Sequence, residues 1–89
     1  MPKRIDMVCT TYILYSVQLD RYYVGFTREE VTERLQKHLQ NHSGFTGKAK
    51  DWTIVHAEEF NKKEEAHARE LQIKKWKSRK MIEALIGSD

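Results

Sequence analysis

The chain has 89 residues and a net charge of +3, from 16 basic and 13 acidic side chains. A hydrophobic content of 39% suffices for one small globular domain and excludes a disordered chain. Its single cysteine, Cys9, excludes an internal disulfide, and no apolar run approaches the roughly 20 residues that a membrane-spanning helix needs. We expect one domain over residues 1–89, with its core at about 8–86, in the cytoplasm and away from membranes.

Two strands are predicted first. Residues 8–17 are rich in Val, Thr, Ile and Tyr and contain no breaker. Both alternating faces of this segment carry apolar bulk, so we expect it to be the central strand of its sheet. A polar turn over residues 18–21 leads to a second strand over 22–26, paired with the first as an antiparallel hairpin. Gly25 within the second strand indicates a bulge or a close backbone approach.

A helix is predicted next, because Thr27 and Glu30 form a capping-box pattern with the threonine as N-cap. The helix should run to about Gln40. Arg34 and His38 are four residues apart, so they share one face beside the apolar stripe of this helix. The stripe consists of Val31, Leu35 and Leu39.

A loop over residues 41–50 precedes a third strand over 52–60. Alternation places Trp52, Ile54 and His56 on one face of that strand.

Two more helices complete the chain. Asn61 and Glu64 form a second cap signal, which opens a helix to about Lys75. Glu70 lies along the apolar stripe of this helix, an unusual place for a carboxylate. Ser78 caps a last short helix, and we predict an α+β fold, a small three-stranded antiparallel sheet flanked by helices, in the order ββαβαα. The apolar seam of the last helix consists of Met81, Ile82, Leu85 and Ile86.

Five side chains are candidates for chemistry. Tyr12 and Tyr23 lie on neighbouring hairpin strands, where side chains come to about 5 Å apart, so the pair can converge or can simply pack. Taken alone, a helical arginine such as Arg34 is usually solvated or paired, and a histidine such as His38 beside a core stripe more often packs or caps a helix. Glu70 could form a buried ion pair, for instance with Arg34. The residues alone leave these alternatives open.

Four segments, in order, resemble the signatures of the GIY-YIG nuclease superfamily. Thr-Thr-Tyr at 10–12 keeps the tyrosine of the first signature, and Tyr-Val-Gly at 23–25 nearly preserves the second. Residues 34–38 resemble the Arg-Leu-x-x-His segment of the family, and residues 68–76 resemble its Arg-Glu-x-x-Ile-Lys-Lys-Trp segment. The resemblance is closest to the small stand-alone bacterial members and covers about residues 10–86.

This resemblance implies an endonuclease that hydrolyses phosphodiester bonds in DNA, as in repair or recombination, with Mg²⁺ or Mn²⁺ and no small-molecule cofactor. Glu70 would hold the cation, and Arg34 would contact the scissile phosphate. Tyr12 would act as general base or position the attacking water. Tyr23 and His38 would orient groups and transfer protons.

Elementary chemistry agrees with that implication. Phosphodiester hydrolysis builds negative charge on the phosphoryl oxygens, and a hard dication and a fixed guanidinium both suit that charge. One carboxylate with several waters is a usual way to hold Mg²⁺. A tyrosine base is awkward because its ordinary pKa is about 10, but neighbouring positive charge should favour the phenolate at Tyr12.

A basic segment supports DNA as the partner. Residues 61–80 hold eight basic and three acidic side chains, a local charge of +5 against −2 for the rest of the chain. Such asymmetry is a typical footprint for a phosphate backbone, although cations at a solvated helix end are the alternative. The predicted DNA contacts are Lys48, Lys50, Lys74, Lys75, Lys77, Arg79 and Lys80.

Other functions also fit parts of the sequence. A non-catalytic nucleic-acid-binding module of the same fold is suggested by the altered first signature and by the absence, at residues 77–79, of the late asparagine of the family. A protein-interaction module whose basic helix meets an acidic partner is a third possibility. His38 and His42 have the spacing of zinc ligands but lack an evident third ligand. A protein partner for targeting, and a monomer or weak dimer, complete the expectations.

Overall fold

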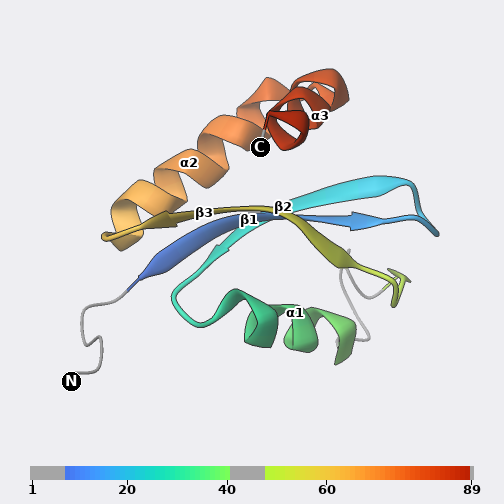
Figure 1. The fold of residues 1–89 in the computed structure, drawn as a ribbon, viewed down its shortest axis with the longest axis horizontal. Coiled ribbons are helices and arrows are strands. Elements are labelled where there is room, and N and C mark those ends of the chain that lie inside the picture. Colours follow the sequence, from blue (N-terminus) through green and yellow to red (C-terminus); the bar gives the residue numbers. More distant parts are fainter. Residues whose placement is uncertain (1–7, 41–47, 89) are drawn as a thin grey trace.

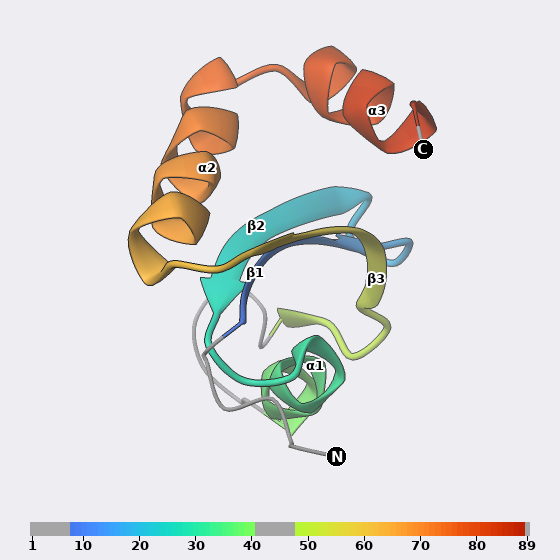
Figure 2. The same cartoon turned by 60° about the vertical axis from the view of Figure 1, so that its left-hand side comes forward.

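The computed structural model describes residues 8–40 and 48–88. Its element order is ββαβαα, and its sheet is three-stranded and antiparallel, which confirms the predicted α+β class. Helix α1 covers one face of the sheet and helices α2 and α3 cover the other, as Figures 1 and 2 show. The elements are β1 (Cys9–Ser16), β2 (Arg21–Thr27), α1 (Val31–Gln40), β3 (Thr53–Phe60), α2 (Lys63–Trp76) and α3 (Arg79–Gly87).

The sheet has the order β2-β1-β3, so β1 is the central strand, as predicted. Its side chains point alternately into two separate cores, because each face of the sheet is covered by a helical layer. Tyr12 and Leu14 belong to the core on the α1 side, together with Trp52. Ile13 belongs to the core on the other side, where it packs with Ile73 of α2. Within the described residues, no helix is long and apolar enough to cross a membrane.

A β-bulge in β3 changes which face His56 occupies. On the partner strand β1, Leu14 pairs with Ile54 while Ile13 pairs with His56, so Val55 is the extra residue. The prediction that His56 shares a face with Ile54 is therefore wrong. Simple alternation counts through the strand, whereas the extra residue moves every later side chain to the other face.

On that other face, His56 joins a polar network that ties β3 to α2. Its Nε2 lies 2.8 Å from a carboxylate oxygen of Glu58, and Arg69 of α2 donates to Glu58 at 2.9 Å. Burial raises the pKa of Glu58, but Arg69 and His56 outweigh it and hold the pKa of that carboxyl below its ordinary value. The network packs one helix against an edge strand through paired charges.

Helix α1 begins later than its capping box predicts. Thr27 remains the last residue of β2, because it is still paired with Thr10 of β1. Its hydroxyl accepts a hydrogen bond from the backbone N–H of Glu29 at 3.1 Å, inside the connecting segment. The helix begins at Val31. The prediction of Thr27 as N-cap is therefore wrong, since strand pairing holds this residue extended.

The two later helices differ in how well their caps were predicted. The N-cap of helix α2 is Lys62, whose side chain makes no capping hydrogen bond. The predicted cap, Asn61, lies one residue too early in the chain. Helix α3 does begin with Ser78, whose Oγ accepts from the backbone N–H of Met81 at 3.2 Å. The predicted Ser78 cap is confirmed, and it fixes the entry of a helix that follows α2 after a single left-handed residue, Lys77.

Candidate active site

Three aromatic rings from three different elements meet on the α1 side of the sheet. Tyr12 of β1 is 1% exposed, and its hydroxyl lies 2.9 Å from Nε2 of His38, which stands in the last turn of α1. The ring of Tyr23, on β2, lies 5.0 Å from the His38 ring and 6.5 Å from the Tyr12 ring. The two tyrosines therefore converge around the histidine.

Gly25 makes this convergence possible. It is the residue of β2 that pairs directly with Tyr12 of β1. A Cβ at Gly25 would lie 2.7 Å from the Tyr12 hydroxyl oxygen and 2.9 Å from Cζ, so any side chain here would collide with the tyrosine. The predicted close backbone approach is confirmed, and the pairing of β1 with β2 runs through it without a bulge.

Arg34 stands one turn before His38 on α1 and interacts with Tyr12. A hydrogen bond with Arg34 lowers the pKa of Tyr12, but burial of the phenol is the larger effect and the pKa ends above 10. The chain itself therefore keeps Tyr12 protonated near neutral pH. The positive charge of Arg34 does lower the pKa of Tyr12, as the sequence predicts, but burial of the phenol outweighs this contribution.

His38 is buried, and this changes its charge. Burial lowers the pKa of His38, and the positive charge of Arg34 lowers it further. The imidazole is therefore neutral at pH 7, with one ring nitrogen able to accept a proton. A phenol 2.9 Å from a neutral imidazole nitrogen is an arrangement that can pass a proton from Tyr12 to His38.

Glu70 approaches from the other layer. It lies on α2 and is 8% exposed. Its carboxylate forms an ion pair at 2.6 Å with Lys74, one turn further along the same helix. Its negative charge contributes to the raised pKa of Tyr12, so the carboxylate is within electrostatic reach of the tyrosine. The ion pair with Arg34 that the sequence allowed does not form in the described part of the chain. The partners of Glu70 come from its own helix.

His67 is a residue of this site that sequence reasoning missed. Its Nε2 lies 3.7 Å from Oε1 of Glu70, and its ring stacks on Phe26 of β2 with the centroids 4.9 Å apart. The signal was present, since residues three apart on a helix share a face. The resemblance drew attention to the signature residues that follow, and not to the histidine one turn before Glu70.

Three of the predicted DNA-contacting cations have protein partners. Lys74 pairs with Glu70, as above, and Lys50 donates to the carbonyl of Leu39 at 2.7 Å. Arg79 pairs with Asp20 at 2.6 Å and with Glu83 at 2.8 Å, and stacks over the ring of Tyr22. The other predicted cations are exposed; they are Lys48, Lys75, Lys77 and Lys80.

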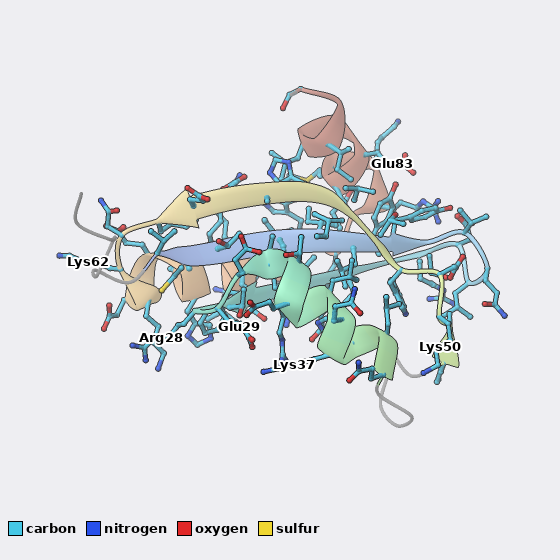
Figure 3. All side chains as sticks on the ribbon, turned by 60° about the horizontal axis from the view of Figure 1, so that its bottom comes forward. Arg28, Glu29, Lys37, Lys50, Lys62 and Glu83 are labelled. Atoms are coloured by element: carbon cyan, nitrogen blue, oxygen red, sulfur yellow. The ribbon has the colours of Figure 1, made fainter. Side chains whose placement is uncertain are left out.

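The exposed charges are spread widely over the molecule. Figure 3 shows Lys50 and Lys62 at opposite ends, with Lys37 on α1 between them. Lys37 pairs with Glu29 at 3.1 Å, so this cation is also engaged. The idea of zinc at His38 and His42 reaches outside the described residues, because His42 is not among them. Within the described ranges, no group of three or more His, Cys, Asp or Glu side chains could hold a metal ion.

The α+β domain thus brings a buried tyrosine, a half-buried tyrosine and a histidine together on the α1 side of its sheet. The model of the GIY-YIG catalytic domain matches residues 8–83, and the chain belongs to this family of nucleases. The resemblance inferred from the four signatures is thus confirmed.

One solved structure is similar over nearly the whole chain. It is the solution NMR structure of the UPF0213 protein BH0048 from Bacillus halodurans, at 26% identity and a TM-score of 0.59. The similarity covers 93% of this chain and 86% of the other. No curated protein matches the chain.

Proposed function

We propose that this protein is a metal-dependent endonuclease that hydrolyses phosphodiester bonds in DNA, in repair or recombination. The observation that carries the proposal is the hydrogen bond of 2.9 Å between the Tyr12 hydroxyl and Nε2 of a neutral His38, with Arg34 beside it. A proton acceptor and a phosphate-binding cation are the two groups that such hydrolysis needs most from a protein.

Glu70 is the residue that would hold Mg²⁺ or Mn²⁺. A mostly buried carboxylate at a helix surface fits a hydrated dication, since Mg²⁺ is often held by one or two carboxylates and keeps several waters. The bound cation supplies stabilisation of the negative charge that develops on the phosphoryl oxygens. Lys74 already neutralises one oxygen of Glu70, so the other oxygen is the one available for this role.

The remaining chemistry belongs to the α1 side of the sheet. We propose that the Tyr12 oxygen takes the proton of the attacking water while its own proton passes to Nε2 of His38. This relay needs a protonated phenol and a neutral imidazole, and the raised pKa of Tyr12 and the lowered pKa of His38 both favour that state. Arg34 would bind the scissile phosphate with its planar fork, and Tyr23 would orient the imidazole through its ring contact.

A non-catalytic DNA-binding module of the same fold is the competing function. The altered first signature favours it, but one of the two substituted residues of that signature makes a structural contact of its own. Thr11 points to the α2 side, where its hydroxyl donates to the carbonyl of Ala66 at 2.7 Å. The substitution thus fastens α2 to β1 and leaves Tyr12, on the opposite face, in contact with His38.

A nicking assay on supercoiled plasmid tests the proposal. We expect the wild type to nick DNA with Mg²⁺ or Mn²⁺ and to stop when EDTA is added. Glu70→Gln should lose the activity while it keeps its circular dichroism spectrum. Glu65→Gln, which removes an exposed charge from the same helix, is the matched control and should cleave normally. Wild-type protein that binds DNA but never nicks it would favour the non-catalytic module.

A further inference from the structure

We infer that His67 is a second protein ligand of the cation held by Glu70, and that it makes the site prefer transition-metal cations such as Mn²⁺ and Co²⁺ over Mg²⁺. The inference rests on the proposed role of Glu70 and adds a ligand and a metal preference to it. His67 and Glu70 are three residues apart on α2, so one helical turn presents both side chains to the same point.

The separation of the two donor atoms fits a shared cation. Nε2 of His67 lies 3.7 Å from Oε1 of Glu70, which is too long for a direct hydrogen bond. Two ligands about 2.0–2.2 Å from one metal ion stand roughly 3.0–3.5 Å apart when they occupy adjacent coordination positions. A small rotation of the half-exposed imidazole therefore closes the pair around a cation.

The two oxygens of the Glu70 carboxylate face different neighbours. Its Oε2 lies 2.6 Å from Nζ of Lys74, and its Oε1 faces the imidazole of His67. A cation at Oε1 would thus leave the ion pair with Lys74 in place. The lysine also orients the carboxylate, which aims the second oxygen toward the histidine side.

The imidazole of His67 is held before any cation arrives. Its ring stacks on Phe26 with centroids 4.9 Å apart and planes 25° apart. Phe26 follows Gly25 on β2, and the Tyr12 hydroxyl lies directly against Gly25. The stacking therefore anchors His67 to the same edge strand that carries the tyrosine site, while half of its side chain stays open to solvent.

A nitrogen ligand changes which cation binds best. Mg²⁺ prefers oxygen donors, whereas affinity at a mixed nitrogen and oxygen site rises from Mn²⁺ through Co²⁺ to Ni²⁺. The remaining coordination positions would be filled by water or phosphate oxygens. Removal of the nitrogen should therefore weaken Co²⁺ and Mn²⁺ binding and leave Mg²⁺ binding almost unchanged.

His67→Phe separates the nitrogen from the stacking, because the new ring can still lie on Phe26. We would titrate the full chain, without DNA, with MnCl₂, CoCl₂ and MgCl₂ by calorimetry. Loss of an outer-shell partner alone costs about 10–100-fold in metal affinity, so loss of a ligand should weaken Co²⁺ and Mn²⁺ at least tenfold. Mg²⁺ affinity should stay within about twofold, and the control Glu65→Gln should match the wild type.

A measurement on the unaltered protein keeps the inference testable if the variant folds poorly. Substoichiometric Mn²⁺ should broaden the imidazole resonances of His67 before those of buried His56, and Glu70→Gln should abolish the broadening. Unchanged Co²⁺ affinity in a folded His67→Phe protein, or sharp His67 resonances in Mn²⁺-bound wild type, would overturn the inference. Nicking that survives in His67→Phe with Mg²⁺ leaves the proposed nuclease intact, whereas Mn²⁺ bound at His67 without any nicking would refute only the nuclease.

Discussion

Gly25→Ala tests how the candidate active site is assembled, because the change adds a single methyl group where β2 passes the Tyr12 hydroxyl. The added Cβ would lie 2.7 Å from the hydroxyl oxygen, against at least 3.4 Å for ordinary contact. The tyrosine must therefore move by about 0.7 Å to restore that contact distance, or the backbone of β2 must move instead. The hydrogen bond to His38, 2.9 Å long, would be stretched or broken.

The expected cost of this change is that of overpacking. Extra methyl groups in a well-packed core cost about 1–3 kcal/mol. Alanine gains back up to about 1 kcal/mol relative to glycine in a strand, because glycine loses more backbone entropy on folding. A net loss of about 1–2 kcal/mol should lower the melting temperature by roughly 5–15 °C in a domain of this size. Thermal unfolding followed by circular dichroism measures the shift.

A double-mutant cycle shows whether the clash is with the hydroxyl. Tyr12→Phe removes the nearest atom, at 2.7 Å, but leaves the ring carbon Cζ at 2.9 Å. Gly25→Ala should therefore cost less in the Tyr12→Phe background than in the wild type, by about 0.5–1 kcal/mol. Equal costs in the two backgrounds, or full nicking activity in Gly25→Ala, would refute the idea that this glycine exists to let the hydroxyl reach His38.

Further expectations concern chemistry, DNA binding and pH. Tyr12→Phe and Arg34→Ala should each lower cleavage by about 10²–10⁴-fold while DNA binding, measured by anisotropy, stays within a few-fold. Arg79→Gln should lower the melting temperature because it unfastens α3 from the hairpin, without changing the salt slope of DNA binding. A triple Lys→Gln change at the exposed cations of this region should instead flatten that slope by about two units, and an unchanged slope would place the DNA path elsewhere. The three cations are Lys75, Lys77 and Lys80. The pKa of His38 in the folded protein lies below 6.5, so the unfolded state binds more protons just below that pH. The free energy of unfolding should therefore fall as the pH drops through 6.5. His38→Gln should flatten this dependence.

The order and type of the elements follow from local signals. The run of β-branched and aromatic residues, the polar turn and the serine before α3 are each decided by nearby neighbours in the chain. Thr27 failed as a cap for a non-local reason, since β1 pairing holds it extended. The predicted face of His56 was wrong for a similar reason, because the bulge at Val55 depends on pairing with β1. Alternation continues through the segment in sequence, and only the register against β1 shows that one residue has been skipped.

Most residues of the candidate site could be predicted from the sequence, His67 excepted, whereas their protonation states could not. Tyr23 and His38 converge on Tyr12, because hairpin and helix geometry bring the three side chains together. The protonation states depend on how deeply the phenol and the imidazole are buried, and burial is a property of the packed core. The pairing of Glu70 with Lys74 and the approach of His67 are local to α2, so helical spacing alone could have revealed both.

The edge strand β2 links the two halves of the proposed chemistry. Tyr12 and His38 belong to the α1 side of the sheet, whereas Glu70 and His67 stand on α2, which covers the opposite side. Groups on opposite faces of a sheet are normally separated by its backbone and its side chains. Strand β2 contacts both groups, because Gly25 presents no side chain toward the phenol of Tyr12 and the neighbouring Phe26 stacks against the ring of His67. Because β2 touches both groups, the proposed activity should be more sensitive to changes in β2 than to equally conservative changes in β3, the other edge of the sheet.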